Sequence, residues 1–540
     1  MTAAPPAPLS ARRRRAAVRL LAAAFVAAAP ALAGGPALRP LDGAMRPAEK
    51  IVNGQLDFGH PAVGALLGPR GLRCSAVLVG CRTALTAASC FCTDPFTGEP
   101  LAGPECLVRP EILDTTGHTL FLQHHPPLPV QEAIVHPGYE PGGGHDLALL
   151  RLGAAAAGIA PLPLREGDPP APGSPGELVG FGRAGGETED WGMKRTGRVA
   201  LAACDAVPDD GNLCWRFTAP LPAPGESVNA CDRDAGGALI VAGGDGPRLA
   251  GILSGGLGAD CLPPDEGWAT EAAAARDWIV ATTLDDPLAP AACGDLRSAG
   301  APGTFVQGSH GDLDGTSPDF RTTFAIPAGS VLLRVNLNGD ENGRLAEAPD
   351  ADLYLRAGAP PERDAYDCAS TGSGLFESCE IAAPEEGIWH ALVAREAGAG
   401  PFQLTATSFA ALDTECAPGP HTLCVDDQPG DRRFKVEIDY FSPPRAVAGR
   451  GRAIPLAELG VSRGGLFWFF AADNPEVLVK VLDACTPALG NRFWVFLTAG
   501  TDLGYSLTVT DTASGLQRTY VNEDGVPALP VQDIDAFPCP

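Results

Sequence analysis

The chain has 540 residues, several times the usual size of one domain, so we expect two to four domains. Its formal net charge of −26 argues against nucleic acid as a partner, because phosphate binding needs clustered basic side chains. With 66 Gly and 53 Pro, the composition favours short strands joined by many turns over helical bundles.

The first fifty residues have the pattern of an export signal. A basic cluster at 12–15 precedes an apolar run at 16–31, and small residues at 31 and 33 fit signal-peptidase cleavage. The run is too short and too rich in alanine to predict a membrane anchor, and no later stretch qualifies as a span. We expect a signal peptide at 1–33, a propeptide-like segment at 34–50 and a secreted protein, and the sixteen cysteines fit an oxidising destination.

Three β-rich units follow along the chain. From 51 to 285, many short apolar runs are broken by Gly and Pro, and an alanine-rich helix is expected at 272–283. In the second unit, 294–409, the alternation at 331–337 is typical of a half-buried strand. The third unit, 410–540, has aromatic strand cores. The sequence therefore predicts an all-β protein.

Four motifs of the first unit point to one family. Residues 50–54 read KIVNG, residues 85–90 read LTAASC, residues 146–152 read DLALLRL and residues 231–237 read CDRDAGG. In this order they resemble the activation site and the three catalytic segments of the trypsin/chymotrypsin family of serine proteases. The resemblance implies a two-barrel chymotrypsin-like domain, followed here by two β-sandwich domains.

The resemblance places Ser89 at the position of the catalytic histidine, Asp146 at that of the aspartate and Ala235 at that of the serine. Hydrolysis in this family needs a serine oxygen as nucleophile and an imidazole to take its proton. Ala235 has no oxygen, and a serine hydroxyl is no base near neutral pH. Losing such a triad typically removes about 10⁶ in rate, so we predict a catalytically inactive homologue.

The resemblance also assigns the surrounding binding features. The oxyanion hole falls at Arg233 and Ala235, where the family has glycine in place of Arg233. The specificity pocket falls at Asn229, Ser254 and Gly256. Because Asn229 is not a carboxylate, we expect no strong preference for basic side chains.

The sequence retains the residues that the family uses for activation by cleavage. In the family, cleavage after a basic residue, here Lys50, frees an amino terminus, here Ile51, which pairs with an aspartate, here Asp234. We hypothesise that such cleavage still orders the loops of the cleft and switches a binding surface. The alternative is an inherited sequence with no present role.

Three histidines lie in segments where a substitute for the missing base could be sought. His145 adjoins Asp146, but adjacent residues of an extended segment point to opposite faces. His124 and His125 lie in a proline-rich stretch, and we interpret them as solvated loop residues. We therefore expect no compensating active site.

Pairing of the sixteen cysteines follows partly from the resemblance, since connectivity is not deducible from sequence alone. The family has counterparts of three bridges, and the remaining pairs are weaker expectations. The expected pairs are Cys74–Cys90, Cys204–Cys214 and Cys231–Cys261, then Cys92–Cys106, Cys81–Cys293, Cys368–Cys379, Cys416–Cys424 and Cys485–Cys539.

The second unit resembles the bacterial pre-peptidase C-terminal domain, through DADLYL at 350–355, YDC at 366–368 and GIW at 387–389. That family has a jelly-roll-like sandwich attached to secreted proteases, and some relatives bind calcium. Acidic side chains here have the oxygen ligands that calcium needs, although a solvated acidic turn is the interpretation we favour, and we expect no metal or other cofactor. These side chains are Asp340, Glu341, Asp350 and Asp352. The third unit is expected to be an Ig-like sandwich of unknown function.

Three functions are compatible with these features. The first is a secreted, non-catalytic homologue that binds peptides, inhibitors or an extracellular surface. The second is a working secreted serine endopeptidase with unusual residues. The third is an adhesive or structural surface protein in which the protease fold is a spacer. None of the three has nucleic acid as its partner or a membrane span.

Overall fold

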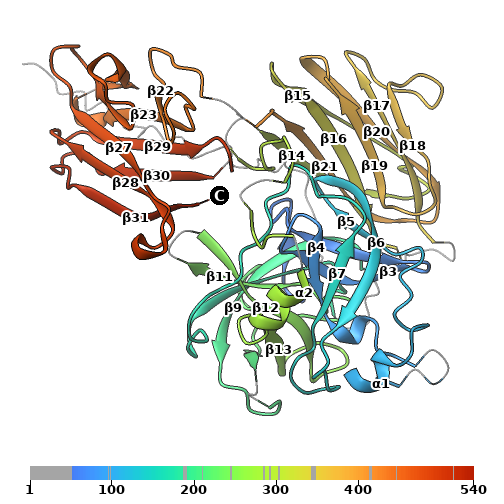
Figure 1. The fold of residues 1–540 in the computed structure, drawn as a ribbon. Coiled ribbons are helices and arrows are strands. Elements are labelled where there is room, and N and C mark those ends of the chain that lie inside the picture. The colour runs from blue at the N-terminus through green and yellow to red at the C-terminus, as the bar shows by residue number, and fades with distance from the viewer. Residues whose placement is uncertain are drawn as a thin grey trace, which may run out of the picture. The chain divides into compact units, whose positions relative to one another are not determined.

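Two closed barrels of antiparallel strands form the first domain of the computed structural model (Figure 1). Their strands are short because Gly, Pro and turn residues interrupt the apolar runs. The first barrel comprises β2 (Val63–Gly68), β3 (Gly71–Leu78), β4 (Thr83–Thr86), β7 (Ala148–Leu152), β6 (His125–Val135) and β5 (Thr119–Leu122). The second comprises β8 (Pro175–Gly180), β9 (Arg195–Ala202), β10 (Asn212–Phe217), β13 (Asp265–Glu271), β12 (Gly246–Gly256) and β11 (Ala238–Gly243), with β1 (Gln55–Leu56) on the outer side of β9.

The structure describes residues 51–539 except 95–96, 98, 186–190, 209–210, 244–245, 284–285, 291–292, 302–303, 342–347, 413–415, 446 and 515. The predicted signal peptide, the propeptide-like segment and Lys50 lie outside the described residues. By their contacts, the described residues belong to one compact unit.

One hydrophobic core joins the two barrels. It contains Leu85 and Leu149 of the first barrel together with Val179 and Ile252 of the second, all fully buried. Burying such side chains stabilises each by roughly 1.5–3 kcal/mol. The barrels are thereby held face to face, and the loops at their junction are fixed in place.

Few helices accompany the barrels: η1 (Ala88–Cys90), α1 (Gly103–Leu107) and α2 (Arg276–Thr283). The helix expected at 272–283 is shorter than predicted. Ala272 donates its backbone N–H to the Ala250 carbonyl oxygen, which extends the sheet, so the chain becomes helical only from Arg276.

The second domain is a sandwich of two four-stranded sheets around Leu353, Val393 and Phe402. The strand at 319–326 alternates exposed and less exposed positions, as half-buried strands do, whereas the strands at 332–339 and 400–409 are buried on both faces, so the expectation of a half-buried strand at 331–337 is wrong. One sheet has the order β14 (Phe305–Leu313), β21 (Gly400–Phe409), β16 (Leu332–Gly339) and β19 (Glu377–Ala382), and the other β15 (Asp319–Ile326), β20 (Gly387–Ala397), β17 (Asp350–Ala357) and β18 (Cys368–Ser370).

The third domain is a second sandwich, with Phe434, Phe467 and Phe493 in its core. One sheet contains β22 (Leu423–Val425), β23 (Phe434–Ser442), β24 (Val447–Arg450), β29 (Gly504–Asp511) and β30 (Gln517–Asn522). The other contains β25 (Arg452–Pro455), β26 (Gly464–Trp468), β27 (Val477–Ala484), β28 (Arg492–Ala499) and β31 (Val531–Pro538), and short turns are η2 (Pro443–Arg445), η3 (Ala457–Leu459) and η4 (Pro487–Leu489). The all-β prediction, with two barrels followed by further β-sheet domains, is confirmed.

All sixteen cysteines are paired, in the eight combinations expected from the sequence. The Cys81–Cys293 bridge ties the segment after α2 to the first barrel. In the part of the chain that the structure describes, no helix is long and apolar enough to cross a membrane.

Candidate functional site

Ser89 and Asp146 form a closed polar pair at the end of the first barrel. Ser89 lies in η1, directly after β4, and the Cys74–Cys90 bridge fixes this turn to β3. The Ser89 N–H donates to Asp146 Oδ1 over 2.7 Å, and its hydroxyl donates to Oδ2 over 2.9 Å. Asp146 is therefore held by the residue that replaces the expected histidine.

Burial dominates the acidity of Asp146. Loss of solvent around the buried side chain raises the pKa of Asp146 to about 6, and the hydrogen bonds from Ser89 and Ser254 oppose this rise. Ser254, expected in the specificity pocket, thus lies against Asp146, with its hydroxyl 3.1 Å from that of Thr270.

The loop that carries Ala235 is attached to the first barrel through β3. Ser75 donates its N–H to the Ala235 carbonyl oxygen over 2.9 Å, and its hydroxyl donates to the Arg233 carbonyl oxygen over 3.1 Å. Gly236 has a φ of 87°, and a Cβ there would collide with the Ser75 carbonyl oxygen, so only glycine fits. Ala235 itself is half-buried against the core between the barrels.

Two backbone amides of this loop lack a partner within the part of the chain that the structure describes. Neither the Arg233 N–H nor the Ala235 N–H has an acceptor among the described residues. Arg233 has a φ of 70°, a left-handed conformation that a non-glycine residue adopts at an energetic cost. The two amides expected to form the oxyanion hole are thus both unoccupied.

The Arg233 side chain leaves the loop toward an aromatic ring. Its guanidinium lies 4.0 Å from the centre of the Trp191 ring, a cation–π contact. The backbone of Trp191 accepts a hydrogen bond from the N–H of Glu341, which belongs to the second domain. The carboxylate of Glu341 in turn accepts from the Leu72 N–H, at the start of β3.

The predicted specificity pocket contains a carboxylate that the sequence did not reveal. Asn229 is fully buried, with Oδ1 accepting from Trp215 Nε1 over 3.0 Å and Nδ2 donating to Asp265 Oδ2 over 2.7 Å. Asp265 is only partly buried, and its Oδ1 accepts from the Gly258 N–H over 2.8 Å. Gly256 lies beside this carboxylate, because a Cβ there would come within 2.8 Å of Asp265 Oδ2. The expectation of no strong preference for basic side chains rested on Asn229 alone, and Asp265 places a carboxylate beside it.

Asp234 is fully buried below the loop. Its Oδ1 accepts from the Gly182 N–H over 2.7 Å and its Oδ2 from the Cys231 N–H over 3.0 Å. Burial raises the pKa of Asp234 to about 7. Ile51, expected to supply the activating amino terminus, is also fully buried, in the core of the second barrel.

None of the nine histidines hydrogen-bonds to Asp146 in the described structure. His145 stacks on His136, with 4.5 Å between the ring centres. The interpretation of His124 and His125 as solvated loop residues is wrong. His124 is 1% exposed, with Nδ1 lying 2.8 Å from Thr407 Oγ1 of the second domain, and His125 is the buried first residue of strand β6.

Three of the four acidic side chains that could have bound calcium accept hydrogen bonds from different parts of the protein. Glu341 binds the Leu72 amide of the first domain, Asp350 accepts from the Gly374 N–H, and Asp352 accepts from the Tyr354 hydroxyl. Within the described ranges, no group of three or more His, Cys, Asp or Glu side chains is placed to hold a metal ion.

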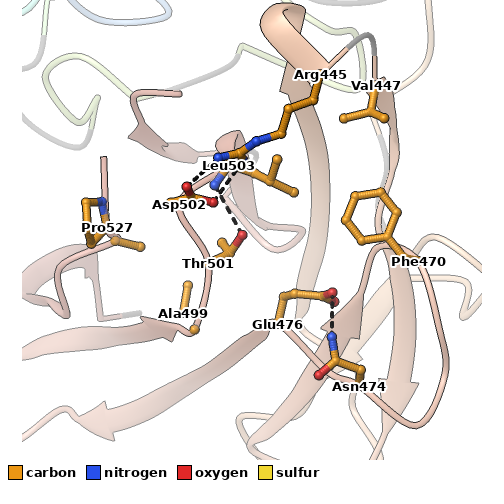
Figure 2. Close-up of a pocket in the computed structure, with 12 residues that line it drawn as sticks. Arg445, Val447, Phe470, Asn474, Glu476, Ala499, Thr501, Asp502, Leu503 and Pro527 are labelled. Carbon is orange, nitrogen blue, oxygen red and sulfur yellow. Dashed lines mark hydrogen bonds and ion pairs between the residues drawn. The ribbon is translucent and has the colours of Figure 1, made fainter. Parts of the chain in front are cut away.

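The third domain has an open hollow of about 560 Å³ (Figure 2). The Arg445 guanidinium forms a two-pronged ion pair with Asp502, and Asn474 Nδ2 donates to Glu476 over 3.1 Å. The polar groups drawn there are engaged with one another, and the exposed Phe470 ring forms one wall. All the lining residues belong to the third domain, so the hollow contributes nothing to the site at the barrels.

Two antiparallel barrels with these segments at their junction define a chymotrypsin-like domain. Comparison with known proteins agrees. Residues 53–279 match the family model Trypsin, and residues 321–395 match the bacterial pre-peptidase C-terminal domain. The chain therefore carries a trypsin-family domain followed by a bacterial pre-peptidase C-terminal domain.

Individual relatives resemble shorter parts of the chain. Two curated proteins are each 32% identical over 104 residues, 19% of this chain: a zinc metalloprotease of Helicobacter pylori and a hemagglutinin/proteinase of Vibrio cholerae serotype O1. The matched parts cover 35% and 15% of those relatives, so this chain spans only a minority of either. Among solved structures, neuropsin, a serine protease expressed in the limbic system of mouse brain, is 24% identical, with a TM-score of 0.33, over 43% of this chain and 98% of its own.

Proposed function

We propose that this protein is a secreted, non-catalytic trypsin-family homologue that binds peptides in the cleft of its first domain. The observation that carries the proposal is the Ser89–Asp146 pair together with Ala235. An alanine methyl group offers no nucleophile, and the carboxylate that would orient an imidazole is occupied by the Ser89 amide and hydroxyl. Eight disulfides support an extracellular location.

The residues that shape the cleft are retained, which supports a binding role for it. The disulfide Cys231–Cys261 still closes the pocket, and Gly236 and Gly237, where a Cβ would collide with backbone oxygens, are still present. Asp265 gives the pocket a partly exposed carboxylate, which favours a basic side chain as its occupant. The ligand class we propose is therefore a peptide with a lysine or arginine side chain in this pocket.

Calorimetric titration tests this function. The full chain is titrated with a peptide that contains one lysine and with the same peptide carrying norleucine at that position. We expect the lysine peptide to bind at least tenfold more tightly, and Asp265→Asn to remove most of that difference. Equal affinity for both peptides, or no binding of either, would contradict the proposal.

A second candidate function is an active endopeptidase, because two relatives of part of the chain are named as proteases. An active endopeptidase would cleave the lysine peptide during the titration, whereas a binding protein would leave it intact. Mass spectrometry of the titrated peptide distinguishes the two functions.

A further inference from the structure

The unoccupied amides beside Ala235 form an anion-binding corner. Arg233 is itself in the left-handed conformation, and neither its N–H nor that of Ala235, two residues further on, has an acceptor among the described residues. Backbone amides of a turn that contains a left-handed residue can form a concavity that suits an anion. Asp232, the exposed acid of the same loop, is paired with Arg183 over 2.9 Å, so its charge is partly offset.

A ligand that fills the pocket brings its main chain to this corner. Asp265 and Gly256 contact each other at the pocket, and Gly237 joins the end of this loop to β12 through the Leu253 amide. A basic side chain held by Asp265 therefore has its own carbonyl carbon in the neighbourhood of Ala235. The group presented to the amides is either a peptide carbonyl or, at a chain end, a carboxylate.

The second domain closes the path beyond this corner. Ser75 contacts Ala235, and three residues earlier on the same strand the Leu72 amide is already bound by Glu341. At about 3.3 Å per residue, that is roughly 10 Å away. The second domain also binds the segment at 191–192, because the Glu341 N–H donates to the Trp191 carbonyl oxygen and Asn338 Nδ2 donates to that of Gly192 over 2.8 Å.

A buried contact surface keeps this closure in place. Gln403 accepts from the Lys194 N–H over 2.6 Å and donates to the Asp57 carbonyl oxygen over 2.9 Å, and all three residues are buried. Phe376 of the second domain meets Phe121 of the first edge to face, with 4.9 Å between the ring centres. The two domains are thus in contact through hydrogen bonds and apolar packing.

We propose that the cleft is a receptor for the carboxyl-terminal end of a peptide, with a basic last residue in the pocket and its free carboxylate on the amides of Arg233 and Ala235. This inference rests on the proposed function and names its ligand. A free carboxylate forms charge-assisted hydrogen bonds that are about twice as strong as those of a neutral carbonyl. A chain that continues from the corner along β3 toward Leu72 meets Glu341 within about three residues.

Three peptides of one sequence test this proposal by titration calorimetry on the full chain. The first ends in lysine with a free carboxylate, the second ends in lysine amide, and the third continues for six residues after the lysine. We expect the free acid to bind at least tenfold more tightly than either of the others. If all three bind equally, the chain-end proposal is overturned while peptide binding stands. If none binds, the proposed function itself fails.

The variant Glu341→Ala distinguishes two effects: obstruction of a longer peptide by the second domain, and recognition of the peptide's free carboxylate by the amides. Glu341→Ala removes the side chain that binds the Leu72 amide, so we expect the six-residue extension to gain affinity several-fold toward that of the amide. The free acid should still bind more tightly than the amide. Glu386→Ala, which removes an exposed carboxylate of the same domain, should leave all three affinities unchanged. An extension that binds as weakly to Glu341→Ala as to the natural chain overturns the role of Glu341.

Discussion

The Ser89 hydroxyl donates a hydrogen bond to Asp146 across 2.9 Å, while the Ser89 amide binds the other oxygen of the same carboxylate across 2.7 Å. A buried carboxylate without donors would be strongly destabilising. Serine in place of the expected imidazole therefore leaves no unsatisfied charge at this position. The change at the site is compensated locally, and the barrel around it stays intact.

Removal of the Ser89 hydroxyl should destabilise the fold. Ser89→Ala takes one donor from a buried acid, so we expect the free energy of unfolding to fall by about 1–3 kcal/mol at pH 8. Urea denaturation measures the change. Ser373→Ala, at an exposed serine of the second domain, is the control and should change stability by less than about 0.5 kcal/mol. An equal effect of both substitutions would contradict the role of the Ser89–Asp146 bond.

Asp146 should make stability depend on pH in a defined window. Its pKa is raised from 3.8 to about 6 in the folded protein, so between these values the folded state binds the proton more tightly than the unfolded state. The contribution of Asp146 to stability therefore falls as the pH rises from about 4 to about 6, and is level above and below. Relative to Asp146→Asn, the natural chain should lose on the order of 3 kcal/mol across this window, measured by urea denaturation at each pH. A constant difference between the two proteins would show that burial does not shift this group.

Restoring the family residues should restore hydrolysis. The triple variant Ser89→His, Arg233→Gly and Ala235→Ser should hydrolyse a lysine anilide at least ~10³-fold faster than the natural chain, because nucleophile, base and an unobstructed oxyanion corner are present together. The double variant that keeps Ala235 is the matched control and should stay at the natural level. A triple variant that folds and remains inactive would mean that the loop is not held in a competent geometry.

A chain that begins at Ile51 should have a more ordered cleft. Its new ammonium group can neutralise the buried Asp234, whose carboxylate accepts hydrogen bonds from the Gly182 and Cys231 amides. Hydrogen exchange should then slow in residues 181–185 and 231–237, relative to a chain that begins at residue 34. With Asp234→Asn in both chains the difference should vanish. Identical exchange in the natural pair would contradict a retained activation device.

The sequence predicts the local features well because they depend on short motifs and their spacing. Ser89 and Asp146 are hydrogen-bonded to each other, and Cys74 pairs with Cys90 as expected. These assignments need only the order of segments along one chain. The same holds for the all-β architecture, which follows from interrupted apolar runs.

The parts that could not be predicted come from contacts between distant segments. Asp265 reaches the pocket because the Cys231–Cys261 bridge and the pairing of β12 with β13 draw its strand against Asn229. His124 is buried with its ring against Thr407 of the second domain, and Glu341 of the second domain binds the Leu72 amide of the first. The residues next to Asp265, His124 and Glu341 in the sequence do not predict these partners.

The most direct test of the central claim is the reaction of the natural protein, begun at Ile51, with a serine-directed fluorophosphonate and a lysine anilide. We predict no covalent adduct at the 231–237 loop by mass spectrometry and no turnover above the uncatalysed rate, with an active trypsin-family protease as the positive control. Turnover that the fluorophosphonate abolishes, together with an adduct on the chain, would contradict the account and identify a working serine protease.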